Sequence, residues 1–149
     1  MVDTKFTIEK RDLFTVPKDY YLCHCISADF ALGAGIAKKF AEMGVRNSLY
    51  LNYNRYYHWI DRGECLFTNA TEWKGEYNLV TKDKCFHKPT INTLKQALVS
   101  MWEHCHNEEK IAMPKIGCGL DKLNWCDVEQ IIKDVFADTD VEILVCDWR

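Results

Sequence analysis

Short apolar segments typical of buried strands alternate along this chain with segments whose apolar residues recur at helical spacing. Such alternation builds a sheet whose strands are joined by helices packed on its faces. The chain has 149 residues, the size of one ordinary domain, and no repeat or Pro/Gly/Ser-rich linker interrupts it. The sequence therefore predicts a single α/β domain over residues 1–149, a three-layer α/β/α sandwich around a mixed central sheet.

Several segments have the alternating or continuously apolar pattern of strands. They are residues 5–9, 20–26, 65–68, 77–81, 111–113 and 141–146. The first alternates polar and apolar side chains, which predicts a half-buried strand, and the last is expected to lie inside the sheet. Residues 73–76, which include Gly75, are the expected hairpin turn between the third and fourth strands.

Other segments carry apolar residues one helical turn apart and are predicted as helices. They are residues 35–43, 47–59, 89–105 and 124–136. The third has Pro89 in its first turn, and its phase predicts that Trp102 is buried in the core, as is Trp125 of the fourth. Asn124 has the residue type of an N-cap for the fourth helix, with Asp127 three residues later as in a capping box.

The charge balance bears on possible partners. The chain has 19 lysines and arginines against 22 aspartates and glutamates, a formal charge of −3. There is no basic surplus for general nucleic-acid binding, so backbone groups and a few side chains would have to hold any anionic ligand. The aromatic residues between Tyr50 and Trp59 are expected to form the apolar face of a helix rather than a base-stacking surface.

The eight cysteines would indicate a disulfide scaffold only in a secreted protein. Residues 1–5 lead directly into the first strand without the apolar run of a signal peptide, and no apolar stretch is long enough to span a bilayer. We therefore expect free, mostly buried thiols in a cytoplasmic or nuclear protein without membrane attachment. The Cys-His-Cys run at residues 23–25 and the His-Cys-His run at 104–106 lack zinc-site spacing, so neither a metal nor a cofactor is expected.

Two segments place glycines after a predicted strand, at residues 27–37 and 114–121, and a helix is expected to follow each. Glycine tolerates positive φ and lets a ligand approach the main chain, and the unpaired N–H groups of a helix start attract anions. Neither segment has the third glycine of a dinucleotide fingerprint, and the chain has no GxxxxGK[ST] phosphate loop. Together the loops predict a phosphate or diphosphate site of another kind, although either loop alone is equally an ordinary tight turn.

These segments carry a family resemblance. Cys-His-Cys-Ile-Ser at residues 23–27, Gly-Ala-Gly-Ile-Ala at 33–37 and Pro-Lys-Ile-Gly-Cys-Gly-Leu-Asp at 114–121 resemble the macrodomains. The chain looks most similar to the branch of terminal ADP-ribose protein glycohydrolases and O-acetyl-ADP-ribose deacetylases. Segments 11–14, 79–82 and 87–90 are also similar to that branch. The departures are Arg11 in place of the usual glycine, Asp83 in place of a basic residue, and a poor match over residues 43–62.

The resemblance implies that the domain binds ADP-ribose. It implies that Asp12 hydrogen-bonds the adenine amino group and that the two glycine loops grip the diphosphate, with Ser27 as a supporting contact. The substrate-binding residues implied in this way are Asp12, Leu13, Ser27, Gly33, Ala34, Gly35, Ile36, Ile116, Gly117, Cys118, Gly119 and Leu120.

In the same branch a lysine at a strand end and an aspartate after the second glycine loop carry the reaction, and the matching residues are Lys82 and Asp121. A lysine attacks an anomeric carbon only as the neutral amine. Burial and the cations of Lys84 and Lys88 would lower its pKa, whereas Asp83 would raise it. Asp121 is expected to protonate the leaving carboxylate or to activate water. From the residues alone, a solvated strand-end lysine is the favoured interpretation of Lys82, and Asp121 would equally be a turn carboxylate.

The implied activity is hydrolysis of ADP-ribose from acidic side chains of ADP-ribosylated proteins, or deacetylation of O-acetyl-ADP-ribose, by a monomer. Two alternatives stay open. One is a module that binds ADP-ribose without turnover, and the other is a phosphatase that acts on ADP-ribose 1″-phosphate. The presence of both Lys82 and Asp121 favours the hydrolase, since a binding module needs neither.

Overall fold

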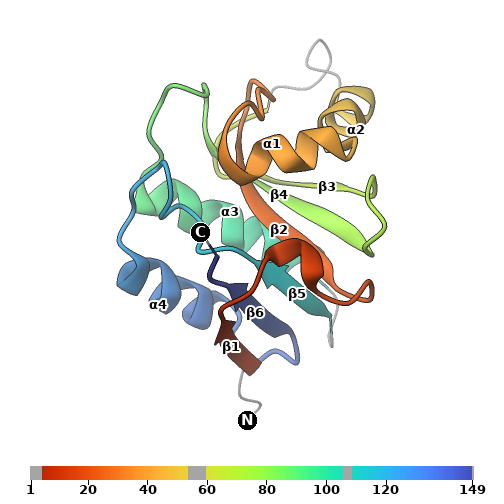
Figure 1. The fold of residues 1–149 in the computed structure, drawn as a ribbon. Helices are drawn as coiled ribbons and strands as arrows, with labels where there is room; N and C mark the ends of the chain where they lie inside the picture. The colour runs from red at the N-terminus through yellow and green to blue at the C-terminus, as the bar shows by residue number, and fades with distance from the viewer. Residues whose placement is uncertain (1–4, 54–59, 106–108, 149) are drawn as a thin grey trace.

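The computed structural model describes residues 5–53, 60–105 and 109–148. Its strands and helices alternate along the chain (Figure 1), which confirms the predicted α/β class. The strands are β1 (Lys5–Glu9), β2 (Tyr21–Ser27), β3 (Cys65–Thr68), β4 (Gly75–Lys82), β5 (Lys110–Met113) and β6 (Glu142–Cys146). The helices are α1 (Gly35–Glu42), α2 (Val45–Asn52), α3 (Ile91–His104) and α4 (Trp125–Val135), with a short 3₁₀ turn, η1, at Leu13–Thr15.

The strands form one mixed sheet in the order β1-β6-β5-β2-β4-β3. All neighbouring pairs are parallel except β3 and β4, which form an antiparallel hairpin at one edge. As predicted, the last strand lies inside the sheet, between β1 and β5. Because the other strands run parallel, their carboxyl ends share one edge of the sheet, which is where open α/β folds bind their ligands.

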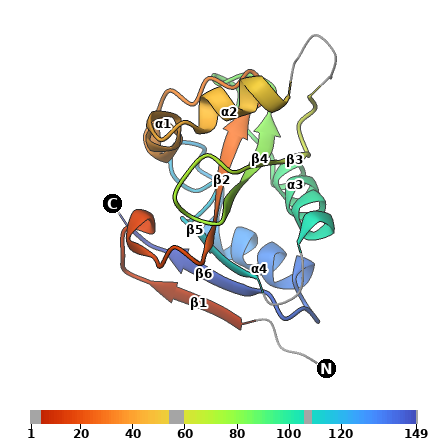
Figure 2. The ribbon, with the colours of Figure 1, turned by 90° about the vertical axis from the view of Figure 1, so that its right-hand side faces the viewer.

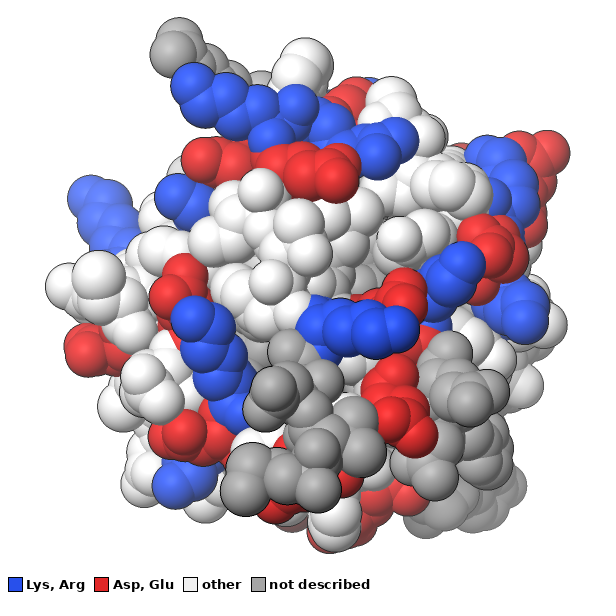
Figure 3. Space-filling view, turned by 90° about the horizontal axis from the view of Figure 1, so that it is seen from below, with Lys and Arg blue, Asp and Glu red and all other residues white. Residues whose placement is uncertain are grey.

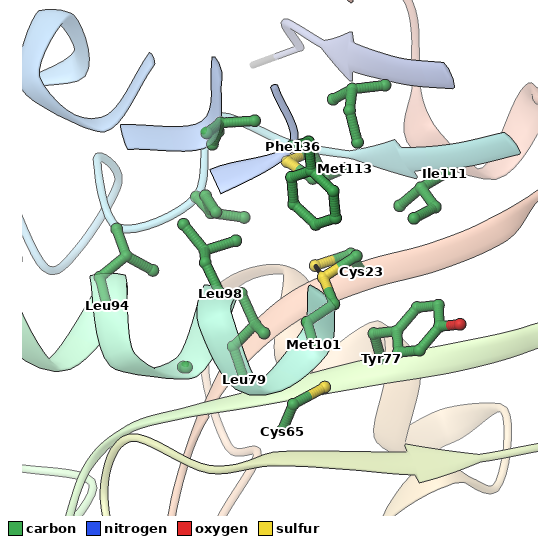
Figure 4. Close-up of a cluster of buried hydrophobic side chains, with 14 of the residues drawn as sticks. Cys23, Cys65, Tyr77, Leu79, Leu94, Leu98, Met101, Ile111, Met113 and Phe136 are labelled. Atoms are coloured by element: carbon green, nitrogen blue, oxygen red, sulfur yellow. Dashed lines mark hydrogen bonds between the residues drawn. The ribbon is translucent and has the colours of Figure 1, made fainter. Parts of the chain in front are cut away.

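Helices cover both faces of the sheet (Figure 2), as the predicted three-layer sandwich requires. On one face Phe40 of α1 and Leu49 of α2 belong to one buried cluster with residues of β2 and β4. On the other face, shown in Figure 4, Leu98 and Met101 of α3 lie near Cys23 of β2. Full burial of such side chains contributes roughly 1.5–3 kcal/mol each, so the two apolar layers fix the strands and the loops that follow them.

Three element boundaries differ from the sequence prediction. β4 already begins at Gly75, because the buried Glu76 carboxylate accepts hydrogen bonds from Thr68 and Ala70 and so belongs to the hairpin rather than to its turn. α2 begins at Val45 and ends at Asn52, earlier at both ends than predicted, and residues 54–59 lie outside the described residues. α3 begins at Ile91 behind the N-cap Thr90, so Pro89 precedes the helix instead of lying in its first turn.

Several burial predictions are also wrong. Trp102 is 47% exposed, because the buried stripe of α3 runs through Leu98 and Met101 instead. Trp125 of α4 is only partly buried, since the buried residues of that helix are Val128 and Ile132. β1 is an edge strand with mostly exposed residues. The eight cysteines are all free, but only Cys23, Cys65 and Cys146 are buried, since the others lie on loops, at helix ends or at the strand end that borders a cleft.

Two further features bear on partners. No helix among residues 5–53, 60–105 and 109–148 is long and apolar enough to cross a membrane. The face of the molecule seen from below (Figure 3) carries basic and acidic side chains interspersed with each other. General nucleic-acid binding uses a surface of one sign, and that face does not present one among the residues drawn in colour.

His24 is a fully buried titratable residue at the centre of the sheet. Its Nε2 lies 2.6 Å from Asn78 Oδ1 and its ring stacks on Phe40, with 3.8 Å between ring centroids. Nδ1 has no hydrogen-bond partner within the described part of the chain. Burial lowers the pKa of His24 from its ordinary 6.5 to about 4, although the hydrogen bond with Asn78 opposes the shift.

We expect the protein to lose stability as the pH falls from about 6.5 to 4, because the unfolded chain binds a proton at His24 that the folded chain does not. The stabilisation is fully present above the unfolded pKa and disappears as the pH approaches the folded pKa. Between pH 7 and 4.5 the loss from this one group is about 2–3 kcal/mol. Urea unfolding of the wild type and of His24→Gln measures it. The variant should lose less stability than the wild type over that range, and equal losses would show that His24 does not titrate in this way.

Candidate active site

A cleft of about 810 Å³ lies at the carboxyl ends of the parallel strands. The structure brings all the residues singled out from the sequence to its walls. They are Asp12, Leu13, Ser27, Gly33, Ala34, Gly35, Ile36, Lys82, Ile116, Gly117, Cys118, Gly119, Leu120 and Asp121. Residues from five separate loops and strand ends therefore share one hollow of a size typical for small-molecule sites.

The first glycine loop connects β2 to α1 and has the predicted strand–turn–helix form. Gly35 opens α1 with φ +60°, a conformation that favours glycine. The N-cap Ala34 provides no side-chain hydrogen bond to the first turn of α1. Backbone N–H groups at this helix start are therefore available to an anion in the cleft, and the helix dipole favours one there.

Two non-glycine residues of the same loop are also left-handed: Phe30 has φ 55° and Leu32 has φ 42°. Such backbone costs of order 1–3 kcal/mol per residue and persists only where the surroundings hold it. Both side chains are buried, and Arg46 Nε donates a 2.8 Å hydrogen bond to the carbonyl of Phe30. Side-chain burial and this hydrogen bond thus fix the loop in shape before any ligand arrives.

The carboxylate of Asp29, which the sequence analysis did not single out, ties this loop to the segment after β4. It accepts hydrogen bonds from Ser27 Oγ at 2.5 Å and from the backbone N–H groups of Ala31 and Cys85. Burial alone would raise the pKa of Asp29, but these hydrogen bonds outweigh it and the pKa is lowered. An aspartate two residues after a strand-end serine is a common turn-forming arrangement, and that signal was present in the sequence.

The second glycine loop, residues 114–121, follows β5, and α4 follows after residues 122–124, so the predicted order of strand, glycine turn and helix is confirmed. α4 starts at Trp125, and turn hydrogen bonds such as Leu123 N–H to the carbonyl of Gly117 close the loop first. Gly117 has φ +74°, and a Cβ there would lie 2.8 Å from Leu123 Cδ1. A Cβ on Gly119 would meet no described atom within 4 Å. The positive φ favours glycine at 117, whereas at 119 the absence of a side chain only leaves the cleft open.

The two loops meet across the cleft. A Cβ built on Gly35 would lie 3.5 Å from Leu120 Cδ1, which is van der Waals contact. Lys88 Nζ donates a 3.0 Å hydrogen bond to the carbonyl of Leu120 and so holds the second loop from the β4 side. The side chain of Leu120 is itself exposed. The loops therefore form two walls of one narrow passage.

Lys82 and Asp121 form an ion pair at one end of this passage. Lys82 Nζ lies 2.9 Å from Asp121 Oδ1, and the two side chains are only 17% and 15% exposed. A register shift between β2 and β4 pairs Ile26 with Val80 but Ser27 with Lys82, which leaves Thr81 as an extra bulge residue. Bulges re-aim the neighbouring side chains, and this one brings Lys82 into register with the end of β2 beside the first glycine loop.

The charges around Lys82 differ from the sequence prediction. Its direct ionic partner is the carboxylate of Asp121, not a cation, and Lys88 contacts a carbonyl instead. The carboxylate of Asp83 lies 2.9 Å from the guanidinium of Arg62 and makes its ion pair there. The ion pair with Asp121 requires the ammonium form of Lys82. A nucleophilic role for this amine would require the loss of a proton, and the Asp121 carboxylate at 2.9 Å is an acceptor within hydrogen-bond distance.

The other end of the cleft is formed by the loop after β1 and by the end of β6. Asp12 Oδ1 accepts a hydrogen bond from Phe14 N–H and thereby caps η1. The guanidinium of Arg11, which stands where the family usually has glycine, donates hydrogen bonds to the side chains of Glu9 and Thr15. Trp148 lines the cleft with an indole that is 65% exposed. The sequence analysis missed Trp148, although its place just after a predicted strand end was a usable signal.

The cysteines and histidines of the Cys-His-Cys and His-Cys-His runs do not form a metal site within residues 5–53, 60–105 and 109–148. No group of three or more His, Cys, Asp or Glu side chains there is arranged to hold an ion, and residue 106 lies outside the described ranges. Cys23 lies in the α3 side of the core while His24 stacks on Phe40 of α1, so the two residues take opposite faces of β2 as predicted.

Comparison with known proteins adds independent information. Residues 23–132 match the family described as Macro domain. The chain is 38% identical over 144 residues to the ADP-ribose glycohydrolase OARD1 of Homo sapiens, covering 95% of this chain and 91% of that protein. The macrodomain of Thermus aquaticus DarG has a TM-score of 0.80 at 19% identity, covering 97% of this chain and 99% of that chain. Thermosipho africanus DarTG in complex with ADP-ribose has a TM-score of 0.72 at 14% identity, covering 95% of this chain and 41% of that chain.

Proposed function

The chain belongs to the Macro domain family, and from that premise we propose that it binds ADP-ribose and hydrolyses its acyl esters. Relatives that match most of its length are ADP-ribose glycohydrolases. The single observation that carries the proposal is the nearly buried pair of Lys82 and Asp121, 2.9 Å apart, in a cleft walled by two glycine loops. A site that only bound ADP-ribose would have no use for a nucleophile paired with an acid.

We propose the following pose for the ligand. The diphosphate lies between the glycine loops, where the start of α1 offers backbone N–H groups and Gly33 and Gly119 leave room. The adenine lies at the far end beside Asp12, with the exposed indole of Trp148 available for stacking. The distal ribose then lies next to Lys82 and Asp121. The charges support this placement of adenine, diphosphate and distal ribose along the cleft. In it the diphosphate lies against backbone N–H donors and away from the Asp121 carboxylate.

The proposed reaction begins with proton transfer from the Lys82 ammonium to the Asp121 carboxylate. The neutral amine attacks the anomeric carbon of the distal ribose, a C–N bond forms, and the C–O bond to the acyl group breaks. Asp121 returns its proton to the departing carboxylate, so one side chain serves as base and then as acid. Water then hydrolyses the lysine-bound sugar and ADP-ribose is released. The same groups would serve a modified glutamate and an acetyl group, each esterified at that anomeric carbon.

We also propose that the protein acts as a monomer in the cytoplasm or nucleus, with residues 1–149 as one domain, on ADP-ribosylated proteins or O-acetyl-ADP-ribose. The eight free cysteines support a reducing compartment. The formal charge of −3 argues against general binding to nucleic acid.

The test is to incubate the wild-type protein with three ADP-ribose conjugates and to measure ADP-ribose binding by calorimetry in parallel. We expect saturable binding, together with turnover of O-acetyl-ADP-ribose and of a glutamate-linked ADP-ribosyl peptide but not of ADP-ribose 1″-phosphate. Binding without any turnover would mean a binding module. Turnover of the phosphate alone would mean a phosphatase, and no heat on titration would remove the ADP-ribose site altogether.

A further inference from the structure

A second hollow, of about 540 Å³, adjoins the cleft on the other side of Lys82. It is referred to below as the side hollow, and its walls include Arg62, Thr81, Lys82, Asp83, Lys88 and Asn92. Thr81, Lys82 and Lys88 also line the main cleft. A group bound in the side hollow would therefore lie against the same lysine that the proposed reaction uses.

The side hollow is electropositive in a chain whose net charge is −3. Arg62, Lys82 and Lys88 contribute cations; Asp83, the one carboxylate among the residues lining it, pairs with Arg62, and Asp121 of the main cleft pairs with Lys82. Asp83 is engaged by Arg62 at 2.9 Å, and the described contact of Lys88 Nζ is a neutral carbonyl, that of Leu120. The positive charge of Lys88 is therefore left for an anion to neutralise.

The start of α3 adds to this potential. Thr90 is the N-cap of this helix, and Thr90 and Asn92 both line the side hollow. Helix starts carry a partial positive charge, and the first turn of α3 contains no acidic side chain to offset it. The amide of Asn92 is also a donor and an acceptor of the kind that pairs with a peptide backbone.

Thr81 supplies a separate indication that a ligand belongs here. It is the bulge residue of β4, is 1% exposed, and lines both hollows. Its hydroxyl is buried without a hydrogen-bond partner in the described part of the chain. Leaving a buried hydroxyl unpaired is unfavourable, so such groups commonly mark a place where a ligand or water completes the bonding.

We propose that the side hollow binds an acidic side chain of the modified protein, close in sequence to the residue that carries ADP-ribose. This inference rests on the proposed function and specifies its substrate class: acidic segments rather than isolated esters. The carboxylate would lie between Lys88 and the start of α3, next to Thr81. A nucleic acid is less suited, because general nucleic-acid binding neutralises many phosphates along a basic surface, whereas the side hollow is one pocket in a chain of net charge −3.

Two ADP-ribosylated peptides that differ only beside the modified glutamate provide the test, one with glutamates and the other with glutamines. For the wild type we expect a KM about tenfold lower for the glutamate peptide, with similar kcat, the effect of one partly exposed charge-assisted contact. Asn92→Asp puts a competing carboxylate in the side hollow and favours the helix start, so the fold should be kept. In this variant the KM advantage of the glutamate peptide should disappear, while O-acetyl-ADP-ribose keeps its kinetics.

Asn47→Asp is the matched control, since Asn47 is an exposed residue in the first turn of α2, lines neither hollow, and changes the net charge equally. It should preserve the preference for the glutamate peptide. Equal KM values for both peptides with the wild type would overturn the proposal, while hydrolysis of both would leave the proposed function intact. An ADP-ribosylated oligonucleotide forms a further arm. If Asn92→Asp raised only the KM of the oligonucleotide, the occupant would be a phosphate and the peptide proposal would be wrong.

Discussion

Replacing Lys82 by alanine is expected to lower the turnover of ADP-ribose esters by roughly 1000-fold or more, while ADP-ribose affinity changes only a few-fold. The reason is geometric. The amine lies 2.9 Å from Asp121, and no other lysine is recorded in contact with that carboxylate among the described residues. Without the amine, an ester can still bind through the glycine loops, but the covalent step has no nucleophile. Single-turnover kinetics separates this loss of chemistry from a loss of binding.

Lys39→Ala is a suitable control, because Lys39 also lines the cleft but its amine lies over the ring of Phe14, at 5.6 Å. It should retain wild-type kcat. A complementary measurement is reduction of the wild-type reaction mixture followed by mass spectrometry, which should find the sugar adduct on the peptide that contains Lys82. If Lys82→Ala kept full turnover, or the adduct lay on another residue, the lysine mechanism would be wrong.

The layer arrangement of the fold was predictable because apolar periodicity directly reflects burial. Leu98 and Met101 recur at helical spacing and pack on one face of the sheet, and the last strand lies inside the sheet as expected. Boundaries were less accurate where a side-chain contact across a turn fixes them. Glu76 belongs to β4 because its carboxylate binds groups across the hairpin, a contact with no local sequence signal.

The order of elements around the second glycine loop was predictable from local signals. Asn124 was correctly recognised as an N-cap, and its side chain accepts a hydrogen bond from Asp127 N–H. Because the helix begins only after Asn124, residues 122–124 separate it from the glycine loop. Consequently the N–H groups facing an anion at this loop belong to turns, and only the first loop adds a helix start.

The proximity of Lys82 and Asp121 could not be derived from residue patterns alone. Thirty-nine positions separate them, and the contact depends on the bulge at Thr81 and on the order of strands in the sheet. Family resemblance suggested both residues but not their direct ion pair, and it suggested nothing about the side hollow. Sequence identifies reactive residue types, whereas the distances that decide their protonation emerge only from the folded chain.

Replacing Gly119 by valine is expected to weaken ADP-ribose binding about 100-fold without lowering the melting temperature. Gly119 is not among the glycines with positive φ, and a Cβ there would meet no described atom within 4 Å. The fold therefore accepts a side chain at this position. The added methyl groups would fill the space beside the second loop that the diphosphate needs, and lost phosphate contacts of this kind cost about 1.5–3 kcal/mol. Calorimetric titration and a melting curve measure both quantities on one sample.

Gly44→Ala is the control, and it is expected to change stability but not ADP-ribose affinity. Gly44 lies outside the cleft with φ +101°, so an alanine there should cost of order 1 kcal/mol in stability yet leave ADP-ribose affinity unchanged. Gly44→Ala therefore measures the effect of backbone strain, and Gly119→Val measures the effect of a side chain in the cleft. Neither substitution alone would separate the two effects. Should Gly119→Val bind ADP-ribose like the wild type, the diphosphate does not pass beside this loop. The pose that brings the distal ribose to Lys82 would then have to be abandoned.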